Sequence, residues 1–172
     1  MAANIEQRHA YEDLLQRYLP ALRRLARSYL RDPLEQEDLL QEVALGLWTA
    51  LPRFRGAASE RTWLYRVAHN TAISSTTGRN RRARREQAAE ATDHEAPDAS
   101  PESVAITAQR RARLWAAIDE LPLVDRQIVA LHLEGLSASE IEAVTGLSTG
   151  NVAVRLTRAR RRLTPQVNGE ET

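Results

Sequence analysis

The sequence contains no cysteine and no lysine, and only 5% of it is aromatic, with a single phenylalanine. The absence of cysteine excludes disulfides, thiolate metal sites and a cysteine nucleophile. Without lysine, every basic side-chain contact to a phosphate or a base must come from an arginine guanidinium. No apolar run approaches the roughly 20 residues needed to cross a bilayer, and the N-terminus lacks the apolar stretch of a signal peptide. We therefore expect a soluble, cytoplasmic protein without membrane insertion.

The net charge is close to zero, but the charges are unevenly distributed. The chain of 172 residues carries 24 arginines and 23 acidic residues, a net charge of +1 that at first argues against nucleic-acid binding. Residues 53–85, however, hold nine arginines and one glutamate, and residues 148–163 hold five arginines and no acid, whereas residues 86–109 hold six acids and no arginine. A partner senses the potential within a Debye length of about 8–10 Å. Two basic blocks therefore favour a polyanionic partner over two merely solvated arginine faces.

Nearly all of the apolar periodicity is helical, which predicts an all-α protein. We expect two small helical domains joined by a flexible linker. The first domain is predicted over residues 1–85 and the second over residues 106–172. The acidic segment 86–105 has no apolar stripe, is rich in Ala and Pro, and therefore reads as the linker.

Within the first domain, the spacing predicts a helix from Tyr11 to Leu30 that Pro20 kinks or divides. Asp32-Pro33 is typical of an N-cap followed by proline at the first helical position. A third helix is predicted over residues 59–72. The β-branched and hydroxyl-rich residues 73–78 predict a loop after it.

The second domain contains a helix-turn-helix pattern. Ser137 and Glu140 form a capping box at the start of a short helix, and Gly146 is suited to the left-handed position that ends it. Ser148 then caps a second helix, whose arginines lie on the face opposite its apolar stripe. In this plan the second helix enters the major groove of DNA. The alternative is an ordinary helical hairpin with a solvated basic face.

Several segments resemble a known family. Residues 38–43 (DLLQEV), 51–56 (LPRFRG) and 61–70 (RTWLYRVAHN) resemble region 2 of sigma-70 family RNA polymerase sigma factors of the extracytoplasmic-function (group 4) type. The LP at 121–122, the EGLS at 134–137 and the segment up to Leu163 resemble region 4. The resemblance covers about 11–85 and 106–164.

This resemblance implies a promoter-specificity subunit of bacterial RNA polymerase that directs transcription initiation by recognising −10 and −35 elements. The implied partners are the polymerase core, through a coiled coil of its largest subunit and its flap, promoter DNA, and an anti-sigma factor. It implies no enzymatic activity, no cofactor, no metal and no small-molecule substrate.

The resemblance also assigns residues to three surfaces. Polymerase-core binding is assigned to Asp38, Gln41 and Glu42, which share one helix face with position 45. Recognition and melting of the −10 element are assigned to Arg61, Trp63, Tyr65, Arg66, Asn70, Thr71, Ala72, Ser74, Arg79, Arg81 and Arg82. Recognition of the −35 element is assigned to Ser148, Thr149, Asn151, Ala153, Val154, Arg155, Thr157 and Arg158.

Some positions depart from the family pattern. Residues 73–78 lack the helix-forming and basic residues common there, so a −10 sequence preference does not carry over. Ala153 and Val154 stand where a basic and a small polar residue are common, which removes donors to base edges. Trp63 is equally well explained as a core residue, and His69 as a packing or surface residue.

Two other functions have to be weighed. A stand-alone helix-turn-helix transcriptional regulator explains the second domain, but leaves the acidic face around Asp38 and the first basic block without a role. An enzyme is disfavoured because the histidines are scattered and no phosphate-binding loop or metal-ligand spacing occurs.

Overall fold

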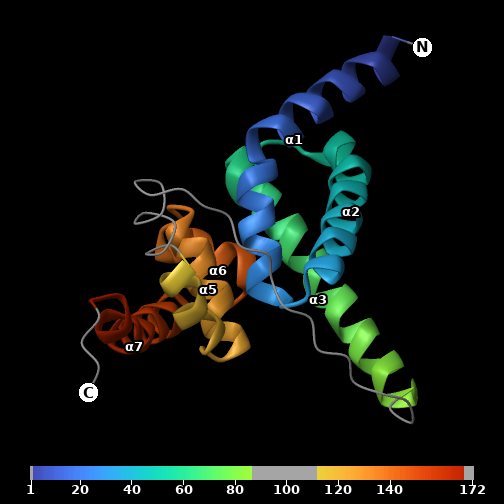
Figure 1. Cartoon of the computed structure of the whole chain (residues 1–172). Coiled ribbons are helices and arrows are strands. Elements are labelled where there is room, and N and C mark those ends of the chain that lie inside the picture. The colour runs from blue at the N-terminus through green and yellow to red at the C-terminus, as the bar shows by residue number, and fades with distance from the viewer. Residues whose placement is uncertain (1, 87–111, 169–172) are drawn as a thin grey trace, which may run out of the picture.

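The computed structural model describes residues 2–86 and 112–168, and within these ranges all regular secondary structure is helical (Figure 1). This confirms the predicted all-α class. The predicted linker beyond residue 86 lies outside the described residues.

The first helix, α1 (Ala2–Tyr29), continues through Pro20 rather than being divided by it. Figure 1 shows α1 changing direction partway along its length, as expected when a proline removes one backbone hydrogen bond and its ring crowds the preceding turn. Leu14, Leu22 and Leu25 lie on its buried face. The predicted helix is therefore present, kinked but not broken.

Helix α2 (Pro33–Ala50) begins as the sequence predicts. The Asp32 side chain accepts hydrogen bonds from the backbone N–H groups of Leu34 at 2.7 Å and Glu35 at 3.1 Å, and Pro33 occupies the first helical position. Leu39, Leu40, Val43 and Leu47 form the buried stripe. A 3-10 turn, η1 (Leu51–Arg53), follows and ends the helix.

Helix α3 runs from Glu60 to Glu86, so the prediction of a loop at residues 73–78 is wrong. Thr76 shows why this segment stays helical: its hydroxyl donates to the carbonyls of Ala72 at 2.8 Å and Ile73 at 3.2 Å. The hydroxyl group thus bonds back to the preceding turn instead of competing for the backbone elsewhere. Low helix propensity is a weak preference that neighbouring turns override.

The C-terminal half contains a helical stretch at 112–119, α5 (Leu123–Leu133), α6 (Ala138–Thr145) and α7 (Thr149–Asn168). The capping box between Ser137 and Glu140 is present, and Gly146 ends α6 with a φ of 74°. The predicted helix-turn-helix is therefore confirmed as a local structure. In α5, Ile128, Val129 and Leu131 are buried as the apolar pattern suggests, but Leu133 is 54% exposed.

The two halves of the chain pack against each other, which the sequence did not indicate. Helix α5 contacts α1, and α6 contacts α3. Leu136, Ile141, Val144 and Val152 from the second half belong to the same buried cluster as Leu64 and its neighbours in the first. Figure 1 shows α5 and α6 beside the lower part of α1. A second, smaller cluster around Ile118 lies within the second half.

Candidate polymerase and promoter interfaces

The predicted core-binding residues lie on one exposed face of α2. Asp38, Gln41 and Glu42 are all exposed. Two leucines extend the same face, because Leu34 precedes Asp38 by four residues and Leu45 follows Gln41 by four. Leu34 is 71% exposed and Leu45 is 66% exposed. The face therefore combines acidic and polar groups with two apolar side chains, of which Leu34 was missed from the sequence although its spacing from Asp38 gave the signal.

The predicted −10 residues divide into buried and exposed groups. Trp63 is 6% exposed and packs against Phe54 with ring centroids 4.8 Å apart, while Tyr65 and Ala72 are each 1% exposed. Arg66, Asn70 and Ser74 are exposed, and Thr71 is half-buried. Arg79, Arg81 and Arg82 belong to the last turns of α3, and their side chains lie outside the described ones. Trp63 and Tyr65 are therefore part of the hydrophobic core, which agrees with the alternative interpretation of Trp63 as a core residue.

A groove between α2 and α3 brings part of the predicted −10 set next to the predicted core-binding face. Asn70, Thr71, Glu42 and Arg53 line it, and its volume is about 530 Å³. Gly46 sets the approach of the two helices, because a Cβ atom there would stand 2.9 Å from the Thr71 hydroxyl. A side chain at position 46 would therefore push Thr71 out of its place.

His69 is a packing residue. It is 8% exposed and its Nδ1 forms a hydrogen bond with the hydroxyl of Tyr29, which is also buried. Burial lowers the pKa of His69 and raises the pKa of Tyr29, since both charged forms are disfavoured away from water. The pair therefore stays neutral and ties α3 to α1.

The first turns of α7 present the predicted −35 residues. Ser148, Thr149, Asn151, Ala153, Thr157 and Arg158 are exposed, and Val154 is 49% exposed, whereas Val152 and Ala159 face the core. Arg155 is held in place: it donates to Asp125 of α5 at 2.6 Å and to the Asn151 side chain at 2.9 Å. Arg158 is thus the better oriented of the two toward a partner outside the protein.

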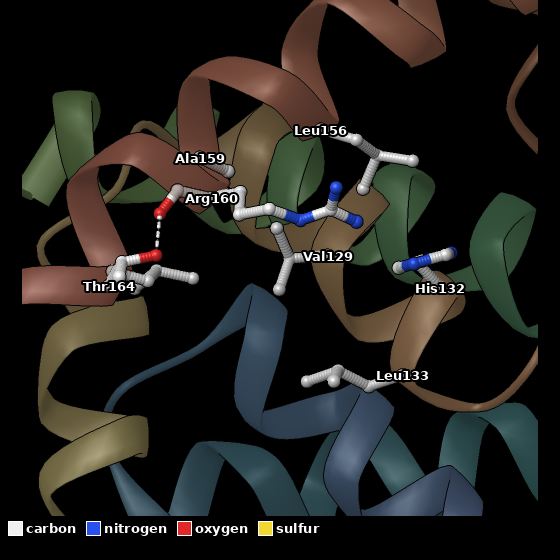
Figure 2. Close-up of a pocket in the computed structure, with 8 residues that line it drawn as sticks. Val129, His132, Leu133, Leu156, Ala159, Arg160 and Thr164 are labelled. Atoms are coloured by element: carbon white, nitrogen blue, oxygen red, sulfur yellow. Dashed lines mark hydrogen bonds between the residues drawn. The ribbon is translucent and has the colours of Figure 1, made fainter. Parts of the chain in front are cut away.

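An apolar groove lies between α5 and α7, with a volume of about 350 Å³. Figure 2 shows Val129, His132 and Leu133 of α5 below Leu156 and Ala159 of α7, with the side chain of Arg160 extending across the view between them. Leu133, which is 54% exposed, adds an accessible apolar side chain to this groove.

A polar network joins the two halves. The Glu134 carboxylate accepts hydrogen bonds from Arg24 Nη2 at 2.8 Å and from the Tyr65 hydroxyl at 3.3 Å. Arg61 donates to the Gly135 carbonyl at 2.8 Å and lies 3.5 Å from Glu140, and Thr62 donates to Glu140 at 3.2 Å. Burial and the neighbouring Glu134 raise the pKa of Tyr65. Glu140 has a lowered pKa, chiefly because it accepts the backbone N–H of Ser137. Of Glu134, Glu140 and Arg24, only Glu140 has a contact predicted from the sequence, the capping box with Ser137, and its contacts with the first half are not predicted.

The described ranges contain neither a metal-binding cluster nor a membrane-spanning helix. No group of three or more His, Asp or Glu side chains there is arranged to hold a metal ion. None of the helices in that part of the chain is long and apolar enough to span a membrane.

Each half of the chain matches a known protein family. Residues 14–85 match sigma-70 region 2, and residues 111–163 match sigma-70 region 4. The ECF RNA polymerase sigma-E factor of Escherichia coli (strain K12) is 30% identical over 164 residues, covering 91% of this chain and 80% of that protein. The ECF RNA polymerase sigma factor SigD of Mycobacterium bovis is 32% identical over 169 residues, covering 93% of this chain and 78% of that protein.

Solved structures share the fold. The sigma factor RpoE in complex with the anti-sigma factor NepR from Bartonella quintana matches with a TM-score of 0.73 at 23% identity, covering 94% of this chain and 99% of that one. CnrH in complex with the cytosolic domain of CnrY matches with a TM-score of 0.65 at 24% identity, covering 95% of this chain and 91% of that one. The two matched regions in this order, together with the identity to full-length relatives, show that the chain belongs to the extracytoplasmic-function RNA polymerase sigma factors.

Proposed function

We propose that this protein is a dissociable promoter-specificity subunit of bacterial RNA polymerase, acting in the cytoplasm and without catalysis of its own. The observation that carries the proposal is the pairing of an exposed acidic and apolar face on α2 with a helix-turn-helix whose second helix carries arginines on its outer side. A stand-alone regulator needs only the second of these. A sigma factor needs both, because it has to bind an enzyme and a promoter.

The α2 face is the proposed docking surface for the polymerase core. Its carboxylates at Asp38 and Glu42 suit a basic partner such as the coiled coil of the largest subunit. Leu34 and Leu45 supply apolar area at the two ends of the same face. The face therefore offers a partner both charged and apolar groups, and protein interfaces contain both.

The outer face of α7 is the proposed −35 reader. Arg158 is the candidate for a bidentate contact to guanine, because its guanidinium fork matches the O6 and N7 acceptors in the major groove. Arg155 instead links α7 to α5, since its guanidinium donates hydrogen bonds to Asp125 and to Asn151. The exposed Val154 is proposed to make an apolar contact with the methyl group of a thymine, which a polar side chain would make less well.

The exposed side chains of α3 are the proposed −10 surface. Arg66 offers a phosphate contact, and Asn70 and Thr71 at the α2–α3 groove offer polar groups to an unpaired base. The buried Trp63 and Tyr65 support this surface from beneath rather than stacking on bases in the arrangement seen here.

The apolar groove between α5 and α7 is the proposed contact for the polymerase flap. An apolar helix with acidic residues at its edge fits a groove lined by Leu133 and Leu156 and bordered by Arg160. Because the sigma factor RpoE, which shares this fold, was solved in complex with the anti-sigma factor NepR, an anti-sigma factor is a further proposed partner.

Run-off transcription with purified core polymerase and a pool of genomic promoter fragments tests the proposal. We expect transcripts only when the protein and the core are both present. A gel shift with the same fragments separates the alternative, since a stand-alone regulator binds its operator without polymerase. Tight, sequence-specific binding by the protein alone, with no transcripts from any fragment, would favour the regulator.

A further inference from the structure

A series of hydrogen bonds runs from α5 to the outer face of α7. The Arg155 guanidinium donates from Nη1 to the Asp125 carboxylate at 2.6 Å and from Nε to the side-chain oxygen of Asn151 at 2.9 Å. Asp125 lies at the inner end of this series, on α5, and the exposed Asn151 lies at its outer end, on α7. A residue outside the second helix of the helix-turn-helix is thereby connected to the surface that this helix presents.

The inner end of the series is fixed. Asp125 lies in the first turn of α5, where the positive end of the helix dipole favours a carboxylate. Its side chain is 13% exposed, and that of Arg155 is 32% exposed. Val129 of α5 and Ala159 of α7 belong to one buried cluster, which holds the two helices against each other. A carboxylate on one rigid helix therefore fixes a guanidinium on the next.

These contacts determine what Arg155 offers to DNA. Nε and Nη1, two of its three guanidinium nitrogens, already donate to Asn151 and Asp125. Arginine reads guanine with two neighbouring N–H groups, so a guanine contact through Nε would break the bond to Asn151. The nearby carboxylate also offsets the positive charge that would attract a phosphate. Arg155 is thus better suited to orienting its neighbour than to contacting DNA itself.

The same bonds determine how the Asn151 amide is oriented. Its oxygen accepts the Nε–H of Arg155, which leaves its NH₂ group for a partner outside the protein. An asparagine that pairs with adenine uses both ends of the amide, because it accepts from N6 and donates to N7. Guanine instead presents two acceptors, O6 and N7, in the major groove. The amide as held here suits guanine better than adenine.

Asn151 also lies where a helix-turn-helix reads DNA. It is in the first turn of α7, and the N-terminal residues of this second helix contact base edges in the motif. Asn151, Arg155 and Arg158 follow one another at spacings of four and three residues, which places them on one helix face. The backbone N–H of Asn151 donates to the Ser148 hydroxyl at 3.4 Å, so the first turn is capped.

We propose that Asp125 is a positioning residue for promoter recognition, which acts through Arg155 to hold the Asn151 amide as a hydrogen-bond donor to a guanine of the −35 element. The proposal rests on the proposed function, because the base that is read belongs to a promoter. The hydrogen bonds from Asp125 to Asn151 are a property of the isolated protein. Specificity at one base pair is thereby set from α5, outside the helix that enters the groove.

The first measurement finds the base pair that Asn151 reads. Holoenzyme is assembled from core polymerase and the full chain, and its affinity is measured by competition with promoter fragments that carry each base pair at each −35 position. In the parent protein we expect guanine to be preferred over adenine by about fivefold or more at one position. Asn151→Ala should abolish the preference at that position alone.

Asp125→Asn keeps the shape of the side chain and removes its charge. Without the carboxylate, Arg155 no longer fixes the Asn151 oxygen, and the amide can turn to pair with adenine. We expect the ratio of guanine to adenine affinity at that position to fall by about fivefold or more, with preferences at the other −35 positions unchanged. Arg155→Lys keeps the charge but lacks the fork, and should act in the same way. The double variant should add little, because both changes break one series of contacts.

Asp119→Asn is the matched control. It makes the same chemical change in the same half of the chain, but the Asp119 carboxylate pairs with Arg27 of α1, at 3.4 Å, instead of with α7. We expect its base preferences to match those of the parent protein. Circular dichroism should show the same helicity for all variants.

A measurement on the isolated protein tests the hydrogen bonds without DNA. The Nε–H of Arg155 gives an NMR signal that Arg155→Lys identifies by removing it. Because this N–H donates to Asn151, we expect it to exchange with water several-fold more slowly than the Nε–H of the exposed Arg158. Asp125→Asn should remove most of the difference, whereas Asp119→Asn should not.

Three results would overturn the proposal. One is an adenine preference at the position that Asn151→Ala affects. Another is equal weakening by Asn151→Ala on every −35 sequence, which would make Asn151 a phosphate contact. The third is a guanine preference that Asp125→Asn leaves as unchanged as Asp119→Asn does. A protected Nε–H of Arg155 in a protein that supports no promoter binding would refute the promoter function and the base readout, but not the hydrogen bonds that link Asp125 to Asn151.

Discussion

At the residue scale, neighbouring side chains decide what each arginine of α7 does. Arg155 and Arg158 are three positions apart on the same helix, and the sequence assigns both to the −35 surface. Asp125 holds Arg155 from the protein side at 2.6 Å, whereas Arg158 is exposed. The two guanidiniums therefore have different roles, which the spacing alone does not separate.

Arg158→Ala is expected to weaken binding of the polymerase holoenzyme by about 1–3 kcal/mol at one base pair of the −35 element. The reason is the loss of a bidentate contact to one guanine. Competition binding with single-base −35 variants measures it, with the exposed Arg161→Ala as the control. Equal weakening on every −35 sequence would instead make Arg158 a phosphate contact.

His69 gives the protein a pH-dependent stability. Burial lowers the pKa of His69 below its unfolded value of about 6.5, so below that pH the unfolded chain takes up a proton that the folded chain does not. The free energy of unfolding should then decrease as pH falls, by up to about 1.4 kcal/mol per pH unit, until the folded pKa is reached.

Urea unfolding between pH 7 and pH 5 measures this dependence. His69→Gln should remove part of it, whereas the exposed His9→Gln should leave it unchanged. The interpretation fails if the two variants show the same pH dependence as the parent protein.

At the element scale, α2 and α3 carry the proposed functional faces on regular helices. The α2 face follows from spacing, since an N-cap at Asp32 sets the helix phase and the buried stripe sets which side faces outward. The length of α3 did not follow, because local propensity at residues 73–78 was outweighed by hydrogen bonds to the preceding turn.

Leu45→Gln is expected to weaken binding to core polymerase by about 1 kcal/mol, or about fivefold, because apolar area leaves the proposed contact. Folding stability should hardly change, since Leu45 is already 66% exposed. Leu19→Gln, at a 39% exposed leucine of α1 outside this face, is the control. Equal core affinity of both variants would remove Leu45 from the interface. Surface-immobilised core provides the measurement.

Gly78→Ala tests the continuity of α3. Gly78 lies inside the helix, and an added Cβ there meets no atom within 4 Å. Alanine in a helix interior is favoured over glycine by about 1 kcal/mol, so we expect more helical signal in circular dichroism and slower amide exchange around residues 73–82. Unchanged or reduced helicity would mean that this segment is not helical in solution.

At the scale of the whole molecule, the shared cluster couples the two halves. Leu136, Ile141 and Val152 are 1% exposed or less and lie in the cluster that also contains Leu64. The distribution of charge along the chain does not predict this contact between the halves. The contact is made by buried apolar side chains and by two glutamates that lie in segments of modest net charge.

The isolated protein should therefore unfold in a single calorimetric transition, with equal calorimetric and van't Hoff enthalpies. Leu136→Ala removes buried contacts at the junction and should lower stability by about 2–5 kcal/mol while separating the transition into two. Two well-resolved transitions in the parent protein would show that the shared cluster does not couple the halves. The exposed Leu19→Ala is the control.

Features that depend on residues a few positions apart could be predicted from the chain alone. These are the helix caps at Asp32 and Ser137, the exposed face of α2, the helix-turn-helix and the segregation of the arginines into two blocks. Caps and amphipathic faces act over one or two helical turns, so spacing is enough to predict them.

Contacts between residues far apart along the chain, in contrast, became apparent only in the folded molecule. Tyr65 and Glu134 are 69 positions apart, and Arg24 and Glu134 are 110 apart, so no local pattern records their contact. Such pairs form because two amphipathic halves bury their remaining apolar surface against each other, which then brings the polar groups at the rim within hydrogen-bonding distance. The basic block at residues 53–85 could be predicted from the chain, but the contact of its Arg61 with the second half depends on the folded molecule.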